Sequence, residues 1–271
     1  MKLESYGKHQ SVMQELIKYI NKKQPGQFVA KGGIALTMCY GVDRATNDMD
    51  FDGRNCNIVP IVKEFCRLNG YQFAVKKDTD TTKRCMVNYG EERTPLKVEV
   101  SYRRHDIPDN IIKDVKGITT YSLDELAVAK AVVYLSRDRI NDVYDLATIC
   151  TQHFDELSQT ARSVAREAVM TRGLEHYEYI AENQMQDTLL KEDVLLERFL
   201  QMYENLDLVR TEQEKELTTK MRNNCKARQS NQKPLFGKKD PKNHELLKSG
   251  RKINRRSKQA KGLPWMRRGI K

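Results

Sequence analysis

The first 120 residues alternate between segments with helical and with strand-like hydrophobic spacing. Apolar residues recur every three or four positions over 11–23 and 58–69, which predicts two amphipathic helices. Five shorter segments with alternating or continuous apolar residues predict strands, at 28–30, 48–52, 71–76, 84–89 and 96–102. Helices and strands mixed in this order predict an α+β domain with a small mixed sheet flanked by helices.

The second half of the chain has only helical spacing. A Ser-Leu-Asp-Glu capping box at 122–125 opens a nearly all-apolar helix that runs to about Leu135, and another helix is predicted from about Asn141. Later helical segments follow at 157–171, 174–183, 189–206 and 212–228. We expect four aromatic residues in their core: Tyr177, Tyr179, Phe199 and Tyr203. The pattern predicts a C-terminal helical-bundle domain.

Basic charge is concentrated near the C-terminus. Residues 210–271 hold 20 Lys or Arg and five Asp or Glu, whereas the other 209 residues hold 28 and 32. The segment after Arg228 is rich in Ser, Asn, Gln, Lys, Pro and Gly, which is typical of a solvated, flexible tail. We therefore predict domains at 1–120 and 121–228 and a basic tail at 229–271. Such a tail favours a polyanionic partner, RNA in particular.

Apolar runs and cysteines restrict the class of protein. The sequence has no run of eighteen apolar residues, so we expect no membrane contact through a spanning helix. Its start lacks an apolar signal region, which predicts a cytoplasmic protein. The six cysteines are scattered and form no Cys-x-x-Cys motif, which argues against a zinc site or a disulfide framework and favours buried thiols.

The clearest chemical pattern joins a glycine pair to alternating carboxylates. Gly32 and Gly33 start a predicted helix, whose free N–H groups and positive dipole end suit a phosphate. Asp48, Asp50 and Asp52 then alternate along a strand, so their side chains share one face about 6–7 Å apart. Carboxylates this close repel unless a cation lies between them, and oxygen ligands suit Mg²⁺. Together they predict a nucleotide site.

Each half of this pattern also has a simpler explanation. A glycine pair before a helix is most often only a turn, and alternating aspartates on a strand are usually a solvated face. The two halves are joined within one strand–helix–strand unit, which makes the functional interpretation more specific.

The unit resembles the signature of the nucleotidyltransferase superfamily, which has a polymerase-beta-like fold. The Lys-Gly-Gly-x-Ala-Leu opening and the Arg-x-Thr-x-Asp-Met-Asp-Phe segment at 44–51 are most similar to the AbiEii/AbiGii toxin branch. Many relatives have Ser or Thr where this chain has Ile34, so one hydroxyl contact to a phosphate is missing. Backbone N–H groups would then hold the phosphate.

The resemblance implies two further site residues in the middle of the chain. A third carboxylate from a neighbouring strand completes the metal site in the family, and Glu99 is the best-placed acid, although relatives more often have Asp. The alternative is that Glu99 belongs to a surface edge strand. Lys130, within Ala-Val-Ala-Lys-Ala-Val-Val, is implied to pair with triphosphate oxygens. Its alternative is a surface lysine whose stem lies along the core.

The segment 137–146 resembles the Arg-x-Lys-Asp-x-x-Asp-Leu motif of the same branch. Arg139, Asp142 and Asp145 match that motif, and Asn141 replaces its usual basic residue. The resemblance assigns all three matching residues to the cleft. For Asp142, a simpler alternative is that it complements the dipole at the helix start.

From this resemblance we expect a nucleotidyltransferase core at 1–120, followed by the helical domain. The implied reaction transfers a nucleoside monophosphate from an NTP to an acceptor, with two Mg²⁺ ions. The expected metal ligands are Asp48, Asp50 and Glu99. The expected nucleotide-binding residues are Gly32, Gly33, Lys130, Arg139 and Asp145. Lys130 and Asp142 are expected to act in catalysis with the metal ligands.

The branch also implies a biological setting and partners. Its toxins act in toxin–antitoxin or phage-defence systems, so a cognate antitoxin is an implied partner. RNA is the expected acceptor, with a tRNA 3′ end first, and a protein hydroxyl is the second choice. The alternative function is a catalytically inactive nucleic-acid-binding protein on the same fold. Ile34 and Glu99 favour that alternative slightly, whereas the intact Asp-x-Asp opposes it.

Overall fold

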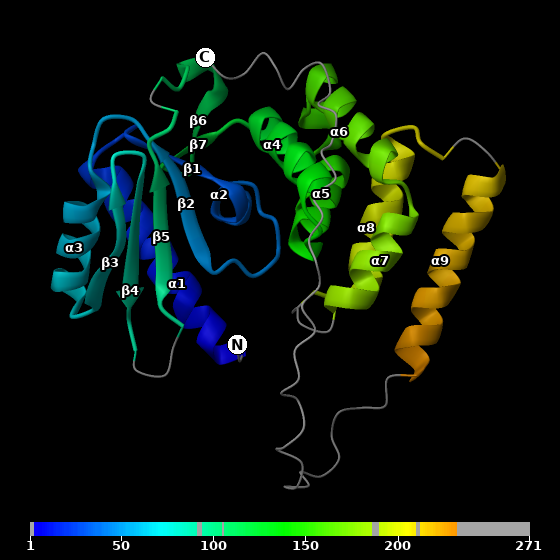
Figure 1. The fold of residues 1–271 in the computed structure, drawn as a ribbon, viewed down its shortest axis with the longest axis horizontal. Helices are drawn as coiled ribbons and strands as arrows, with labels where there is room; N and C mark the ends of the chain where they lie inside the picture. Colours follow the sequence, from blue (N-terminus) through cyan, green and yellow to red (C-terminus); the bar gives the residue numbers. More distant parts are fainter. Residues whose placement is uncertain (1–2, 91–93, 105, 186–189, 210–211, 232–271) are drawn as a thin grey trace, which may run out of the picture. The chain divides into compact units, whose positions relative to one another are not determined.

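A seven-stranded mixed sheet forms the N-terminal half of the protein (Figure 1). In this computed structural model the strand order is β3-β4-β5-β2-β1-β7-β6. The pairs β2–β5 and β1–β7 are parallel, and the other neighbouring pairs are antiparallel. The strands are β1 (Phe28–Lys31), β2 (Asp48–Gly53), β3 (Gln72–Thr79), β4 (Thr82–Asn88), β5 (Leu96–Ser101), β6 (Ile112–Val115) and β7 (Ile118–Tyr121). The predicted α+β class with a mixed sheet is confirmed.

Three helices accompany the sheet, and after β7 the described residues form helices and no further strands. Those that accompany the sheet are α1 (Leu3–Lys23), α2 (Gly32–Cys39) and α3 (Ile58–Asn69). Those that follow are α4 (Leu123–Ser136), α5 (Ile140–Gln152), α6 (Gln159–Arg172), α7 (Glu175–Gln184), α8 (Glu192–Asn205) and α9 (Glu212–Asn231). In Figure 1, α4 to α9 form the predicted helical bundle, in which α5 packs on α4 and α8.

The structure describes residues 3–90, 94–104, 106–185, 190–209 and 212–231. They belong to one compact unit, 1–231, and the domain boundary predicted at residue 120 stays a prediction. The predicted tail, 229–271, lies outside the described residues apart from the last residues of α9. No helix in the described ranges is long and apolar enough to cross a membrane.

Alternation along the central strands separates the core from the face that carries the acids. Met49 and Phe51 on β2, and Val98 and Val100 on β5, are completely buried. The residues between them therefore point to the opposite face of the sheet, because successive side chains of a strand alternate. The buried apolar side chains of α1 and α3 belong to the same core, as their helical spacing predicts.

Local signals explain where several helices begin and end. Asn57 caps α3 by accepting a hydrogen bond from the backbone N–H of Val59, and Gly70 ends it in a left-handed conformation. Ser122 caps α4 by accepting from the N–H of Glu125, which confirms the predicted helix start; the reciprocal half of the capping box is not formed, because the N–H of Ser122 donates to the carbonyl of Ile111. The Ser122 cap thus starts α4 directly after strand β7, which ends at Tyr121.

Three features differ from the sequence prediction. Helix α1 begins at Leu3 rather than at residue 11. The β6–β7 hairpin has no counterpart in the prediction, because its strands are four residues long and partly polar. Its two-residue turn, Lys116-Gly117, has positive φ at both residues. The expected burial of Tyr179 is wrong: it is 56% exposed, whereas the three other aromatic residues are buried.

The core predicts a large difference between two truncations of apolar side chains. Phe51→Ala removes a fully buried ring and should lower the free energy of unfolding by about 3–5 kcal/mol. Leu68→Ala removes a side chain that is mostly exposed and should change it by less than about 0.5 kcal/mol. Urea titration of both variants measures the difference. Equal effects would contradict the described core.

Candidate active site

Strand register brings the predicted acids together. Asp50 on β2 lies directly opposite Glu99 on β5, and on its other side it lies opposite Lys31 on β1. Glu99 in turn lies opposite Arg84 on β4. Adjacent strands are about 4.8 Å apart, so these four residues form one continuous row across the sheet. We call these four residues, in the order Lys31, Asp50, Glu99 and Arg84, the charged row; a cation stands at each end and two carboxylates lie between.

Two ion pairs hold carboxylates of the predicted metal site. Arg84 Nε donates to Glu99 Oε2 at 2.6 Å, and Lys97 Nζ lies 2.7 Å from Asp48 Oδ2. Burial raises the pKa of Asp50; the charge of Lys97 opposes this rise, and the neighbouring carboxylates Asp48 and Glu99 add to it. Asp48, Asp50 and Glu99 therefore repel one another, and additional positive charge between them would stabilise their ionised forms.

Asp52, the third alternating acid, has a different environment. It is buried, accepts a hydrogen bond from Lys31 Nζ at 2.5 Å, and accepts another from the Tyr121 hydroxyl at 2.8 Å. Burial of Tyr121 and the adjacent Asp52 charge raise the pKa of this phenol above its usual value. Asp52 is thus a fixed counter-ion that positions Lys31 beside the glycine pair.

The two glycines of the signature serve different purposes in the fold. Gly32 has φ of +64°, a left-handed conformation that favours glycine, and it lines a cavity together with Asp50 and Lys130. A Cβ at Gly33 would lie 2.8 Å from Arg44 Nη2 and 2.8 Å from Thr46 Oγ1. Gly33 therefore makes room for the Arg44 guanidinium, a requirement that the sequence pattern alone does not reveal.

A buried network of charges connects the loop before β2 with α4 and α5. Arg44 donates to both oxygens of Asp145, at 2.5 and 2.6 Å. Lys130 Nζ lies 2.6 Å from Asp145 Oδ2 and 3.0 Å from Asp142 Oδ1. Arg137 donates to both oxygens of Asp142, at 2.7 and 3.1 Å. Three cations share two carboxylates, so this charge network has an excess of positive charge.

The network specifies the positions of the residues predicted from the 137–146 segment. Asp142 and Asp145 are buried and contact cations rather than line the cavity. Although burial would raise the pKa of Asp142, its bonds with Arg137 and Lys130 lower it overall. Arg139 is exposed at the start of α5 and is not among the cavity-lining residues. Arg137, two residues earlier, lines the cavity instead.

A cavity of about 490 Å³ lies between this face of the sheet and α4. Its cationic lining residues are Lys31, Arg104, Lys130 and Arg137, and its acidic ones are Asp50, Asp52, Glu99 and Glu125. Leu126, Ala129 and Val133 give α4 an apolar wall. The volume is in the range of small-molecule sites, and the mixed lining offers contacts for both a charged and an apolar part of a ligand.

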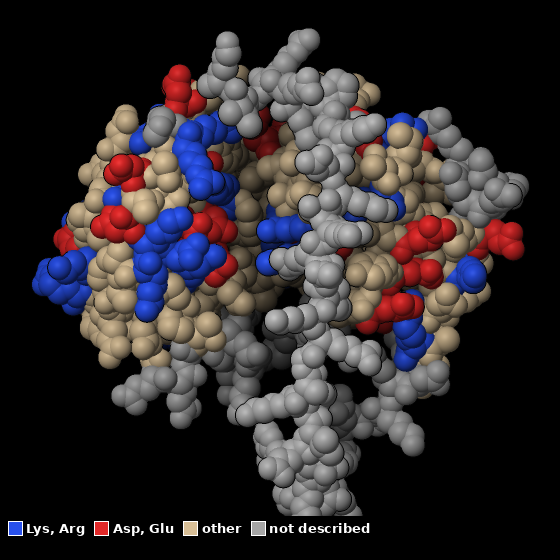
Figure 2. Space-filling model, viewed as in Figure 1, with Lys and Arg blue, Asp and Glu red and all other residues tan. Residues whose placement is uncertain are grey.

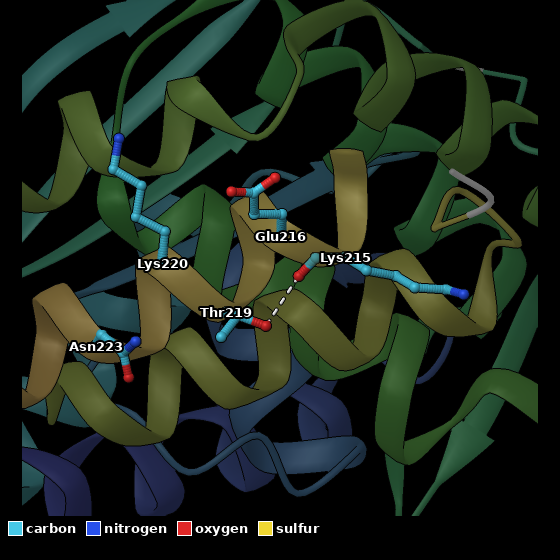
Figure 3. Close-up of a pocket in the computed structure, with 5 residues that line it drawn as sticks. All are labelled: Lys215, Glu216, Thr219, Lys220 and Asn223. Carbon is cyan, nitrogen blue, oxygen red and sulfur yellow. Dashed lines mark hydrogen bonds between the residues drawn. The ribbon is translucent and has the colours of Figure 1, made fainter. Parts of the chain in front are cut away.

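A second hollow, of about 600 Å³, runs along α9. Figure 3 shows its lining residues, which are Lys215, Glu216, Thr219, Lys220 and Asn223. Thr219 donates to the backbone carbonyl of Lys215, and the longer side chains point away from one another. All five come from one helix, so this hollow brings together no chemistry from distant parts of the sequence.

The buried network makes a prediction about stability. Asp145→Asn leaves Arg44 and Lys130 without a shared carboxylate in a buried position and should cost about 3–5 kcal/mol of unfolding free energy. Asp109→Asn breaks the Arg54–Asp109 pair, whose carboxylate is mostly exposed, and should cost less than about 1 kcal/mol. Chemical denaturation of both variants tests this. A small effect at Asp145 would show that the network contributes little to the fold.

Comparison with known proteins agrees with the geometry. The family model described as "Nucleotidyl transferase AbiEii toxin, Type IV TA system" matches residues 19–214. A comparison with curated proteins gave no significant match. Among solved structures, JHP933 from Helicobacter pylori has a TM-score of 0.62 at 22% identity, and the match covers 84% of this chain and 99% of that one. A candidate nucleotidyltransferase from H. pylori has a TM-score of 0.56 at 21% identity, covering 84% and 98%.

These two structures share the fold of the chain, and the family match covers the sheet, the charged row and the buried network. The predicted resemblance is confirmed: the chain belongs to the AbiEii family of nucleotidyltransferase toxins of type IV toxin–antitoxin systems.

Proposed function

We propose that the protein transfers a nucleoside monophosphate from an NTP to an acceptor hydroxyl in the 490 Å³ cavity. The observation that carries this proposal is the charged row, in which Asp50 and Glu99 lie side by side and face the cavity together with Gly32. A carboxylate pair next to a helix start suits a metal-bound triphosphate, because carboxylates and substrate phosphates together hold Mg²⁺ and a helix start favours phosphate.

The donor set fits a divalent cation in kind, and two of its members, Asp50 and Glu99, line the cavity whereas Asp48 is not among the lining residues. Asp48, Asp50 and Glu99 offer only oxygen ligands, which Mg²⁺ prefers. Within the described ranges no three acidic, His or Cys side chains converge as a finished metal site, and Lys97 and Arg84 hold two of these acids. We propose that the three acids hold Mg²⁺ when substrate is present. Bound there, two ions would neutralise the triphosphate and lower the pKa of the attacking hydroxyl.

Residues around the glycine pair and α4 would hold the nucleotide. The backbone N–H groups at Gly32 and Gly33 begin α2, so they suit the triphosphate. Arg137 lines the cavity and is half exposed, which makes it the most accessible cation of the charge network. Lys130 would contribute mainly through its positive charge, because two carboxylates already bind its ammonium.

The proposed reaction is an in-line displacement at the α-phosphorus. The acceptor oxygen forms a bond to that phosphorus, and the bond to the bridging oxygen of the β-phosphate breaks. Pyrophosphate leaves with the electron pair, and the hydroxyl proton is released to solvent. The protein contributes chiefly positioning and electrostatic stabilisation. Asp142 and Asp145 would act by positioning Lys130, Arg137 and Arg44.

We propose RNA as the acceptor, with a tRNA 3′ end as the first candidate and a protein hydroxyl as the second. The excess of Lys and Arg in residues 210–271 supports a polyanionic partner. Membership of a toxin–antitoxin family supports a cognate antitoxin as a further partner. We also retain a role for Arg139, whose exposure leaves it accessible to a substrate.

Asp50→Asn should abolish transfer of an α-³²P-labelled nucleotide while leaving the melting temperature close to that of the wild type. The substitution keeps the shape of the side chain and removes the charge at the centre of the charged row. The matched control is Asp80→Asn in the exposed turn between β3 and β4, which should retain full transfer. Normal transfer by the Asp50 variant would refute the metal assignment.

Removal of residues 232–271 should weaken binding of tRNA and leave NTP binding unchanged. This segment carries much of the basic charge, and each lost phosphate contact reduces the salt dependence of binding. Fluorescence anisotropy with labelled tRNA and a thermal-shift titration with NTP measure the two effects separately. Unchanged affinity for tRNA at low salt would contradict a role of the tail in RNA binding.

A further inference from the structure

Two cations lie on the far side of the catalytic acids from the proposed nucleotide site. In the sheet order β4-β5-β2-β1, Arg84 and Lys97 belong to β4 and β5, whereas Lys31 and the glycine pair belong to the β1 end. Apart from Asp50, Asp52 and Glu99, the cavity is lined by residues of β1, β7 and α4 and by those that closely follow β1, β5 and α4, and neither Arg84 nor Lys97 is among its lining residues. The acids of the charged row therefore separate two sets of cations.

The strands that carry Arg84 and Lys97 present a basic, partly exposed face. Cys85, Val87 and Val98 are fully buried in the core. The alternate residues on the other face are only partly buried, and register places Lys77 opposite Arg84 and Met86 opposite Lys97. Figure 2 shows Lys and Arg side chains next to acidic ones over the region of β3 to β5. We call Lys77, Arg84, Met86 and Lys97 the meander face.

Both cations can exchange their present partners for another anion. The Arg84 side chain is 40% exposed and that of Lys97 is 28% exposed. Ion pairs with this degree of exposure contribute little stability, so breaking them has a small cost. A divalent cation bound by Asp48 and Glu99 would neutralise these carboxylates in place of Lys97 and Arg84. Both basic side chains would then be available to a phosphate.

We propose that the meander face binds the acceptor strand: Arg84 and Lys97 contact the phosphates next to the attacking hydroxyl at a single-stranded RNA end. This inference rests on the proposed function. In-line displacement places the attacking oxygen opposite the leaving pyrophosphate. With the triphosphate on the side of Gly32, the attacking hydroxyl must arrive from the side of β4 and β5. An RNA end brings phosphates to that position, whereas a protein hydroxyl brings none, so the basic face selects nucleic acid.

Anisotropy titration of the full-length protein with a 5′-fluorescein single-stranded oligoribonucleotide, in Mg²⁺, tests the proposal. Arg84→Gln/Lys97→Gln should weaken binding about ten-fold and reduce the log–log salt slope by about 1.4, since each phosphate contact to a single strand contributes about 0.7. The matched control is Lys63→Gln/Arg67→Gln, which removes the same charge from α3 on the other side of the sheet. It should change the affinity less than about two-fold.

A second variant keeps the result interpretable if the double Gln variant folds poorly. Arg84→Lys/Lys97→Arg retains both charges and should keep the wild-type salt slope. The proposal is overturned if the double Gln variant binds the oligonucleotide with wild-type affinity and slope. It is also overturned if label is transferred to a protein and that transfer is unaffected in the double Gln variant.

Failure of this inference and failure of the proposed function give different results. The Mg²⁺-dependent thermal shift of the wild-type protein with NTP reports the nucleotide site alone. If that shift is present and the double Gln variant still binds RNA normally, only the meander face is refuted. If that shift is absent and the Asp50→Asn variant transfers label as well as the wild type does, the proposed function is refuted, whatever the RNA titration shows.

Discussion

The repulsion between Asp50 and Glu99 is the interaction on which the rest of the site depends. Parallel pairing of β2 with β5 forces these two carboxylates to be direct neighbours. A shift of one residue would turn Met49 and Phe51 out of the core, so burial on the opposite face fixes the register. The fold thus uses hydrophobic packing on one side of the sheet to hold like charges together on the other.

The surrounding cations can be understood as the response to this concentration of negative charge. Lys31 and Arg84 end the charged row, and Lys97 pairs with the adjacent Asp48. On the helical side, the buried network presents an excess of positive charge to the same cavity through α4. The proposed substrate would therefore enter a site in which both signs of charge are already fixed in position.

Sequence patterns located the acids well because alternation along a strand is a local property. The alternation of β2 and β5 was enough to place Asp48, Asp50 and Glu99 on one face, and their strands are neighbours as the family resemblance implied. The surroundings of Lys130 depend on tertiary structure. Its apolar neighbours in sequence say nothing about the carboxylates that α5 brings to its ammonium.

Other features were missed for similar physical reasons. The space that Gly33 leaves for Arg44 depends on a contact with the loop before β2. Arg137 rather than Arg139 lines the cavity: Arg137 follows the end of α4 and is held there by its bonds to Asp142, whereas Arg139 precedes the first residue of α5 and is exposed. The β6–β7 hairpin left only Gly117 as a local signal in the sequence, because Lys116 is not among the residue types that favour the positive φ it adopts in this turn.

Nucleotidyl transfer, as proposed for this cavity, breaks the bond between the α-phosphorus and the oxygen that bridges to the β-phosphate. The most direct test incubates the protein with Mg²⁺, total cellular RNA and one NTP at a time, labelled with ³²P at either the α- or the γ-phosphate. We expect label in RNA from the α-position only, together with release of pyrophosphate. Transfer of the γ-label, or no transfer from any of the four nucleotides, would contradict nucleotidyl transfer.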